Sequence, residues 1–164
     1  MIKKTVLNFS VLFLLTICLH GQTLNLDEYE IFISDTLISK SDFANNQTTL
    51  DSTRLKHLEF KPITDGLKKI YYLNGNLYGQ GEIKNRKENG FWVYWHENGQ
   101  KAREGNFDEG KKIGMHTYWY PNGNLRGVGN FKNDKYNGKW TQYKGDGSEP
   151  VVQYYKDGVL IPQK

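Results

Sequence analysis

Residues 90–113 read GFWVYWHENGQKAREGNFDEGKKI, and the chain carries this pattern four times with a step of 24 residues. The opening glycine recurs at that step without insertion or deletion, as Gly66, Gly90, Gly114 and Gly138. Two further columns keep the same step: the aromatic residues Tyr71, Trp95, Trp119 and Tyr143, and the apolar residues Ile83, Phe107, Phe131 and Tyr155. A period of this length is typical of a stacked array in which one unit cannot bury its apolar face alone.

Each copy has the pattern of a β-hairpin. In the second copy, residues 91–96 are a run of strand-forming side chains, and residues 101–107 return as the partner strand. The pair between two such runs favours a type I′ turn, in which both central residues have positive φ. These pairs are Asn74-Gly75, Asn98-Gly99, Asn122-Gly123 and Asp146-Gly147. A second turn, which contains Gly110 in this copy, connects each hairpin to the next.

The columns therefore predict an all-β fold, a single-layer array of stacked antiparallel β-hairpins. The copies occupy residues 66–89, 90–113, 114–137 and 138–161, and residues 162–164 form a tail. Because successive side chains of a strand point to opposite faces, aromatic residues are expected on both faces of the layer. Gly81, Gly105 and Gly129 are expected to lie beneath a ring from a neighbouring strand.

Residues 22–65 lie outside the repeat and are predicted to form a terminal cap of mixed strand and loop. Residues 29–33 and 36–38 have strand character, with Ser34-Asp35 as the turn between them. Residues 41–43 are expected to form a short helical turn, and residues 45–53 a loose polar segment. A further strand is expected over residues 55–61, ended by Pro62.

Residues 1–21 have the pattern of a signal peptide. Lys3 and Lys4 precede an apolar run that is too short to span a bilayer, and cleavage is expected near Gly21. Removal of the segment lowers the formal charge from +4 by the two lysines, which leaves too little positive charge to favour nucleic acid. No lipid anchor is expected on Cys18, because no small residue precedes it. The protein is thus expected to be periplasmic, on the outer surface, or secreted.

The repeat pattern resembles a known family, the MORN repeat (membrane occupation and recognition nexus), in its bacterial variant class. The resemblance is carried by residues 90–95, by Asn98-Gly99 and by residues 105–107, and it covers residues 66–161. It implies a sheet of β-hairpins. It also implies roles ranging from scaffolding, dimerisation and lipid binding to the antitoxin label that many bacterial members carry. An antitoxin acts in the cytosol, so that label conflicts with an export signal.

The sequence lacks a pattern for catalysis, for a metal or for a cofactor. His96 and His116 are twenty residues apart and occupy different columns, so a shared metal site is not expected. The glutamates stand in unrelated repeat positions: Glu82, Glu97, Glu104 and Glu109. The glycines of residues 79–81 lie inside a returning strand and precede no helix, which disfavours a phosphate-binding loop.

Two features favour binding. Lysines gather in the connecting loops as a basic strip suited to an anionic partner, and the candidates are Lys87, Lys111, Lys112 and Lys135. The alternative for this strip is a solvated edge that guards against aggregation. The second feature is the aromatic column Tyr71, Trp95, Trp119 and Tyr143. These rings are expected to form the core first, and if exposed they would offer a platform for sugars or apolar side chains.

The function that these features favour is an exported, non-enzymatic scaffold that binds another protein. Binding of envelope glycan or lipid, or an immunity-like pairing with a toxin, is the alternative. The sequence leaves the oligomeric state open.

Turn chemistry leads to the first prediction. Gly99→Val should lower the free energy of unfolding by about 1–3 kcal/mol, because a β-branched residue resists positive φ. Lys111→Ala should leave it nearly unchanged. Chemical denaturation of both variants measures the difference, and equal effects would show that the hairpin assignment is misplaced.

Overall fold

The computed structural model describes residues 16–19, 22–145 and 148–162. The chain divides into two compact units, Met1–Ile63 and Thr64–Lys164. Among the described residues, no helix has the length and apolar character needed to cross a membrane. The predicted signal peptide falls mainly on residues outside the described part, and only residues 16–19 of it are placed.

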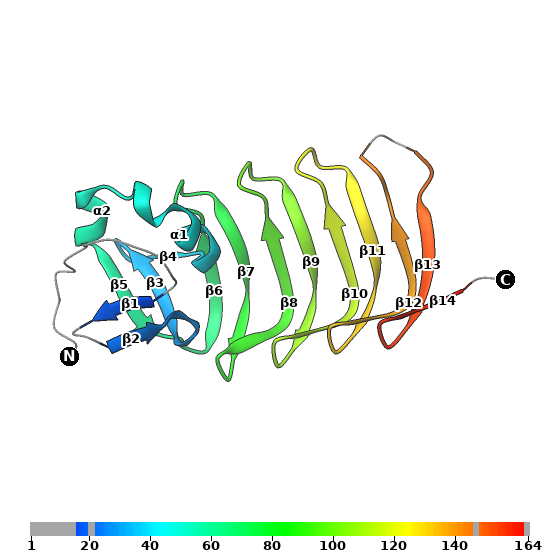
Figure 1. Cartoon of the computed structure of the whole chain (residues 1–164), viewed down its shortest axis with the longest axis horizontal. Helices are drawn as coiled ribbons and strands as arrows, with labels where there is room; N and C mark the ends of the chain where they lie inside the picture. Colours follow the sequence, from blue (N-terminus) through cyan, green and yellow to red (C-terminus); the bar gives the residue numbers. More distant parts are fainter. Residues whose placement is uncertain (1–15, 20–21, 146–147, 163–164) are drawn as a thin grey trace. The chain divides into compact units, whose positions relative to one another are not determined.

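The first unit contains a small sheet and two short helices (Figure 1). β3 (Tyr29–Ile33) is the central strand and pairs with β4 (Thr36–Ile38) and β5 (Leu58–Pro62). The predicted hairpin over residues 29–38 is confirmed, and its turn has φ of 48° at Ser34 and 63° at Asp35. A separate pair joins β1 (Thr16–Leu19) to β2 (Gln22–Asn25), followed by the 3-10 turn Leu26–Glu28.

The helices of this unit differ from the prediction. α1 (Lys40–Asn46) begins after Ser39, whose hydroxyl accepts a hydrogen bond from the Asp42 amide, so the expected helical turn is a longer helix. The segment expected to be loose holds the 3-10 turn Gln47–Thr49 and the start of α2 (Ser52–Lys56). Asp51 caps α2, with its carboxylate 2.8 Å from the Arg54 amide nitrogen.

The predicted strand over residues 55–61 is wrong at both ends. Residues 55 and 56 belong to α2, and β5 includes Pro62, which pairs with Tyr29. Proline is tolerated there because β5 is an outer strand of this three-stranded arrangement. Ile31, Ile38 and Phe43 form its buried core.

In the second unit, β6 to β14 follow one another in sequence order, each antiparallel to the next (Figure 1). The strands are β6 (Gly66–Tyr71), β7 (Leu77–Lys84), β8 (Lys87–Trp95), β9 (Lys101–Asp108), β10 (Lys111–Trp119), β11 (Leu125–Lys132), β12 (Lys135–Gln142), β13 (Val151–Lys156) and β14 (Val159–Ile161). The predicted array of hairpins is confirmed.

The type I′ geometry predicted for the Asn-Gly pairs is wrong, and that geometry occurs at the connecting turns instead. At Asn98-Gly99 only the glycine has positive φ, 82°, and the Gly99 amide donates to the His96 carbonyl oxygen. Together with the hydrogen bond from His96 N to Gln100 O, this is a three-residue loop in which a type I turn is followed by a left-handed glycine. Asn74-Gly75 and Asn122-Gly123 repeat the geometry, and Asp146-Gly147 lies outside the described residues.

The type I′ turns lie at the opposite edge of the sheet, where one hairpin joins the next. Asn85 and Arg86 have φ of 51° and 63°, and Asn133 and Asp134 have φ of 48° and 64°. Carboxylates stabilise two of these corners. Asp65 accepts from the Asn85 and Arg86 amides, and Asp134 accepts from the Lys112 amide at 2.9 Å. The connecting turns, rather than the Asn-Gly loops, therefore carry positive φ at both centres.

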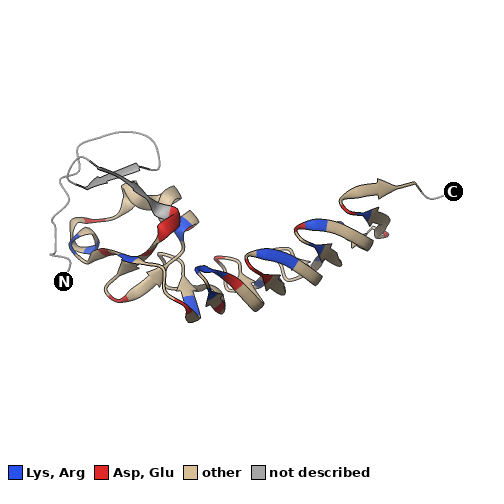
Figure 2. Ribbon diagram, turned by 90° about the horizontal axis from the view of Figure 1, so that it is seen from below, with Lys and Arg blue, Asp and Glu red and all other residues tan. Residues whose placement is uncertain are grey.

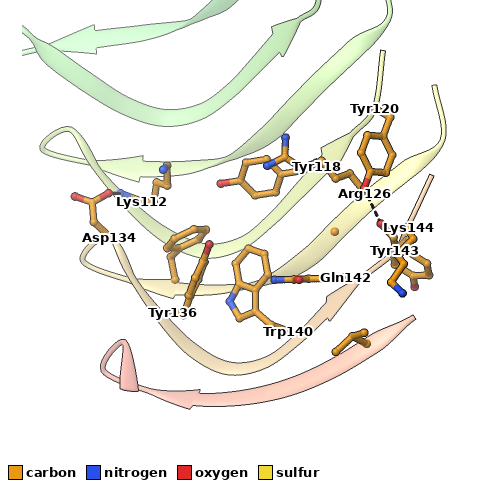
Figure 3. Close-up of a pocket in the computed structure, with 13 residues that line it drawn as sticks. Lys112, Tyr118, Tyr120, Arg126, Asp134, Tyr136, Trp140, Gln142, Tyr143 and Lys144 are labelled. Atoms are coloured by element: carbon orange, nitrogen blue, oxygen red, sulfur yellow. Dashed lines mark hydrogen bonds between the residues drawn. The ribbon is translucent and has the colours of Figure 1, made fainter. Parts of the chain in front are cut away.

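Burial of the array differs between its two faces. The face that carries Trp92, Tyr94 and Trp140, here called the inner face, holds the core: these side chains are 1%, 4% and 4% exposed. The outer face carries Leu67, Phe91 and Met115, which are 87%, 54% and 61% exposed. Aromatic side chains lie on both faces, as predicted, but the core forms on the inner face alone, because the strands bend around its rings and bring them together (Figure 3).

The predicted contact between rings and glycines is confirmed. Trp92 lies over Gly81, His116 over Gly105, and Trp140 over Gly129. A β-carbon built on Gly129 would lie 2.5 Å from Cδ2 of Trp140, so no larger residue fits without displacement. Each contact joins the second strand of one hairpin to the first strand of the next. The ring of one repeat is thereby covered by the backbone of its neighbour.

A second series of contacts joins the Asn-Gly edge of successive hairpins. The Tyr72 hydroxyl donates to the Trp95 carbonyl oxygen at 2.7 Å, and the Tyr120 hydroxyl donates to the Tyr143 carbonyl oxygen at 2.9 Å. Between them, His96 Nε2 lies 2.9 Å from the Trp119 carbonyl oxygen. These bonds recur with the repeat and maintain the spacing of the hairpins at this edge.

A matched pair of substitutions in β11 tests the covered glycine. Gly129→Ala should lower the free energy of unfolding by about 1–3 kcal/mol, because its methyl group enters the volume of the Trp140 ring. Gly127→Ala should change it by less than about 1 kcal/mol, because a β-carbon there meets Thr141 O at 3.4 Å, near ordinary contact distance. Denaturant titration of both variants decides, and comparable losses would contradict the ring-over-glycine account.

Candidate functional site

A hollow of about 660 Å³ lies on the inner face of the third and fourth hairpins (Figure 3). β10, β11 and β12 supply most of its lining, and the start of β13 closes it. The lining residues that carry polar or aromatic groups are Lys112, Tyr118, Tyr120, Arg126, Phe131, Asp134, Tyr136, Trp140, Gln142, Tyr143 and Lys144. The hollow thus combines aromatic rings with cationic side chains and a single carboxylate.

The rings of the hollow support one another. The Tyr136 and Trp140 ring centroids are 4.3 Å apart, and Phe131 packs edge-on against Trp140 at 5.2 Å. The Trp140 Nε1 donates to the Asn130 carbonyl oxygen, so the only polar atom of the indole is satisfied away from the hollow. Tyr136 remains 37% exposed, so part of its ring is accessible from the hollow.

A β-bulge places Arg126 at the hollow. Tyr118 pairs with Gly127, whereas Trp119 pairs with Leu125, so Arg126 is the extra residue of β11 and has no partner in the register. A bulge turns a side chain out of the regular alternation. The Arg126 guanidinium lies 6.0 Å from the centre of the Tyr118 ring.

Tyr118 lies between two guanidinium groups. It pairs with Arg103 on one side and with Gly127, next to Arg126, on the other. Burial raises the pKa of the Tyr118 hydroxyl, and the positive charges of Arg103 and Arg126 act in the opposite direction. The hydroxyl therefore stays protonated and can donate a hydrogen bond to an incoming acceptor.

The carboxylates of the inner face already have partners. Glu88 accepts a hydrogen bond from the Tyr94 hydroxyl, and the Asp134 carboxylate accepts from the Lys112 amide. Burial is the main cause that raises the pKa of the Tyr94 hydroxyl, and the charge of Glu88 adds to it. Among the described residues, no group of three His, Cys, Asp or Glu side chains is placed to hold a metal ion. The arrangement suits binding by cations and rings.

The sequence-based candidates lie in two places. The aromatic column Tyr71, Trp95, Trp119 and Tyr143 is half-buried, so the expectation that it forms the core is wrong. The buried rings of the array belong instead to the columns of Trp92, Tyr94 and Phe107. Of the four predicted rings, Tyr143 lines the hollow. The reason is side-chain alternation: Trp95 points away from the face that Trp92 and Tyr94 share.

The lysine candidates also lie in two places. Lys87, Lys111 and Lys135 are exposed first residues of their strands, at the edge that carries the connecting turns. Lys112 differs, because its Nζ lies 5.1 Å from the centre of the Phe131 ring and it lines the hollow. The structure thus brings Lys112 and Tyr143 to one site and leaves the other candidates outside it.

Sequence reasoning missed Arg103, Arg126, Tyr118 and Tyr136. A signal for Arg103 was present, because it breaks a column in which Gly79 and Gly127 stand one repeat away on either side. The position of Arg126 had no signal, since it depends on a bulge that the 24-residue spacing does not reveal.

The fold defines a protein built from an array of β-hairpin repeats. The model of the MORN repeat variant family matches residues 64–85, 88–109 and 112–133. These segments contain the first three hairpins of the array, and residues 64–133 of the chain are MORN repeats of the variant class. No curated protein matches the chain.

His116 offers a pH test of the inner face. It is 1% exposed, and burial lowers the pKa of its imidazole from the ordinary 6.5. As the pH falls through about 6.5, His116 becomes protonated in the unfolded chain but stays neutral in the folded chain. The free energy of unfolding therefore decreases as the pH falls. The melting temperature should therefore decrease between about pH 7.5 and about pH 5.

The control is His116→Trp, which places in the third copy the residue that stands at Trp92 and Trp140. This variant should fold and should lose part of the decrease in melting temperature on acidification. An identical pH dependence in the two proteins would show that His116 does not carry the effect.

Proposed function

We propose that the protein is a non-enzymatic interaction scaffold whose array binds another protein on its inner face. The observation that carries the proposal is the hollow, where Tyr118, Arg126, Tyr136 and Trp140 meet on a frame of paired strands. Tyr, Trp and Arg are the residue types that contribute most of the energy of protein interfaces. MORN repeats commonly serve as protein- or membrane-interaction modules, and the family is generally non-enzymatic.

The frame favours a preorganised surface. Ring-over-glycine contacts and the hydrogen bonds of Tyr72 and Tyr120 hold the hairpins at constant spacing before any partner arrives. Binding to such a surface costs little ordering entropy. The signal-like residues 1–21 support a partner outside the cytosol, in the cell envelope or the medium, and an exported toxin would be one partner of this kind.

The test is capture of partners from envelope and medium fractions of the source cells by the immobilised protein, compared with two bulky variants of β12. Gln142→Trp places a ring in the hollow, and Lys139→Trp places the same ring on an exposed position that does not line it. The wild type and Lys139→Trp should capture the same protein, and Gln142→Trp should capture about tenfold less.

Equal capture by all three baits would contradict the inner-face assignment. Retention of the wild type on peptidoglycan or on lipid vesicles, without a captured protein, would favour the glycan or lipid alternative instead.

A further inference from the structure

Two cations outside the inner face form ion pairs with carboxylates. Lys101 lies 2.8 Å from the Glu104 carboxylate, and Lys132 lies 3.3 Å from the Asp157 carboxylate. On the inner face, among the residues that the structure describes, no carboxylate lies within ion-pair distance of the side-chain nitrogens of Arg103, Lys112 or Arg126. The protein leaves these three charges without a carboxylate partner.

Aromatic rings take the place of carboxylates beside these cations. The Arg103 guanidinium lies 3.9 Å from the centre of the Tyr94 ring, and the Lys112 Nζ lies 5.1 Å from that of Phe131. A ring face orients a cation and attracts it weakly, but it does not neutralise its charge. The inner face therefore keeps a positive potential beside these cations.

Tyr118 is the centre of this arrangement. Arg103 pairs with it from β9, and Arg126 is the bulge residue of β11, with its guanidinium 6.0 Å from the centre of the Tyr118 ring. Planar guanidinium groups bind carboxylates through two parallel hydrogen bonds. The hydroxyl supplies a further donor. Lys112 and Lys144 add positive charge at the two ends of the hollow (Figure 3).

We propose that this hollow binds an acidic peptide segment of the partner protein, with one Asp or Glu carboxylate held by Arg126 and the Tyr118 hydroxyl, which line the hollow, and by Arg103, which pairs with Tyr118 from the neighbouring strand β9. This inference rests on the proposed scaffold function and specifies the chemistry of its partner. Neighbouring apolar side chains of the peptide pack on Tyr136. Charge complementarity favours an acidic segment, because the hollow is lined by three cations and one carboxylate: Lys112, Arg126, Lys144 and Asp134.

The inner face fits a peptide better than an anionic glycan or a membrane. Sugar recognition uses an exposed flat ring, whereas Trp92 and Trp140 are 1% and 4% exposed and lie over glycines. A lipid headgroup layer is flat, whereas the strands bend around these side chains (Figure 3). The exposed Tyr136 and the arginines suit a peptide that brings carboxylates and apolar groups together.

The charges on the rest of the array also favour the inner face as the site for an acidic partner. Lysines and arginines are interspersed with acidic residues along the ribbon of the array (Figure 2), and the ion pairs Lys101–Glu104 and Lys132–Asp157 neutralise part of that charge. The outer face and the edges thus present mixed charge, which disfavours a single acidic partner on them.

The experiment titrates the purified protein with a short oligoglutamate peptide and follows binding by calorimetry. Arg126→Gln removes a cation of the hollow, and Lys132→Gln removes an equal charge from an exposed strand end. Oligoglutamate should bind the wild type and Lys132→Gln alike, and Arg126→Gln should weaken binding about tenfold or more. Arg126 is exposed on a bulge, so its replacement should not prevent folding.

A second pair of variants tests Arg103. Arg103→Gln should weaken oligoglutamate binding, and Arg103→Lys should restore part of it, because charge is retained while the paired hydrogen bonds are lost. Circular dichroism of each variant establishes that the fold is intact.

Three outcomes would overturn the inference: no binding of oligoglutamate, equal weakening by Arg126→Gln and Lys132→Gln, or stronger binding of oligogalacturonate or phosphatidylglycerol vesicles than of oligoglutamate. Its failure is distinguishable from failure of the scaffold function. If Gln142→Trp abolishes capture of a protein while Arg126→Gln leaves capture unchanged, the scaffold function stands and the acidic-peptide inference is wrong.

Discussion

The contact between an aromatic ring and a bare glycine backbone is the interaction on which the array depends. Trp92, His116 and Trp140 each cover a glycine of the preceding hairpin, and no second sheet is needed to bury them. A ring of this size removes much apolar area from water, and the missing side chain of glycine lets it approach the neighbouring strand closely. One hairpin alone would leave its ring exposed, so the repeats are stable only together.

This constraint also shapes the binding surface. Because the core lies on the inner face, the strands bend around it, and the rings that are not covered by glycine line a hollow. Tyr118 and Tyr136 remain accessible there while Trp140 seals the floor. The last copy adds polar groups to the hollow, because Gln142 and Lys144 stand where the third copy carries Tyr118 and Tyr120. At these two positions the last copy is more polar than the third.

The Asn-Gly loops were predicted at the correct positions but with the wrong turn type. Asn98-Gly99 does reverse the chain, as its composition indicates, but it does so through a three-residue loop with a left-handed glycine. The pairs with positive φ at both centres are instead those of the connecting turns, Asn85-Arg86, Glu109-Gly110, Asn133-Asp134 and Asp157-Gly158, and only two of these contain glycine. The Asp134 side chain accepts from the Lys112 backbone, a long-range hydrogen bond beside one of these corners that local turn preferences do not contain.

The sequence by itself determined the architecture, because a 24-residue period in glycines, rings and turns admits one stacking of hairpins. It also identified the glycines that lie beneath aromatic rings, since Gly81, Gly105 and Gly129 recur with that period. Only the tertiary structure decided which face became the core and where Arg126 points. The curvature that separates an inner from an outer face, and the bulge beside Tyr118, arise from packing between hairpins. Such packing has no counterpart in the spacing of residues along one chain.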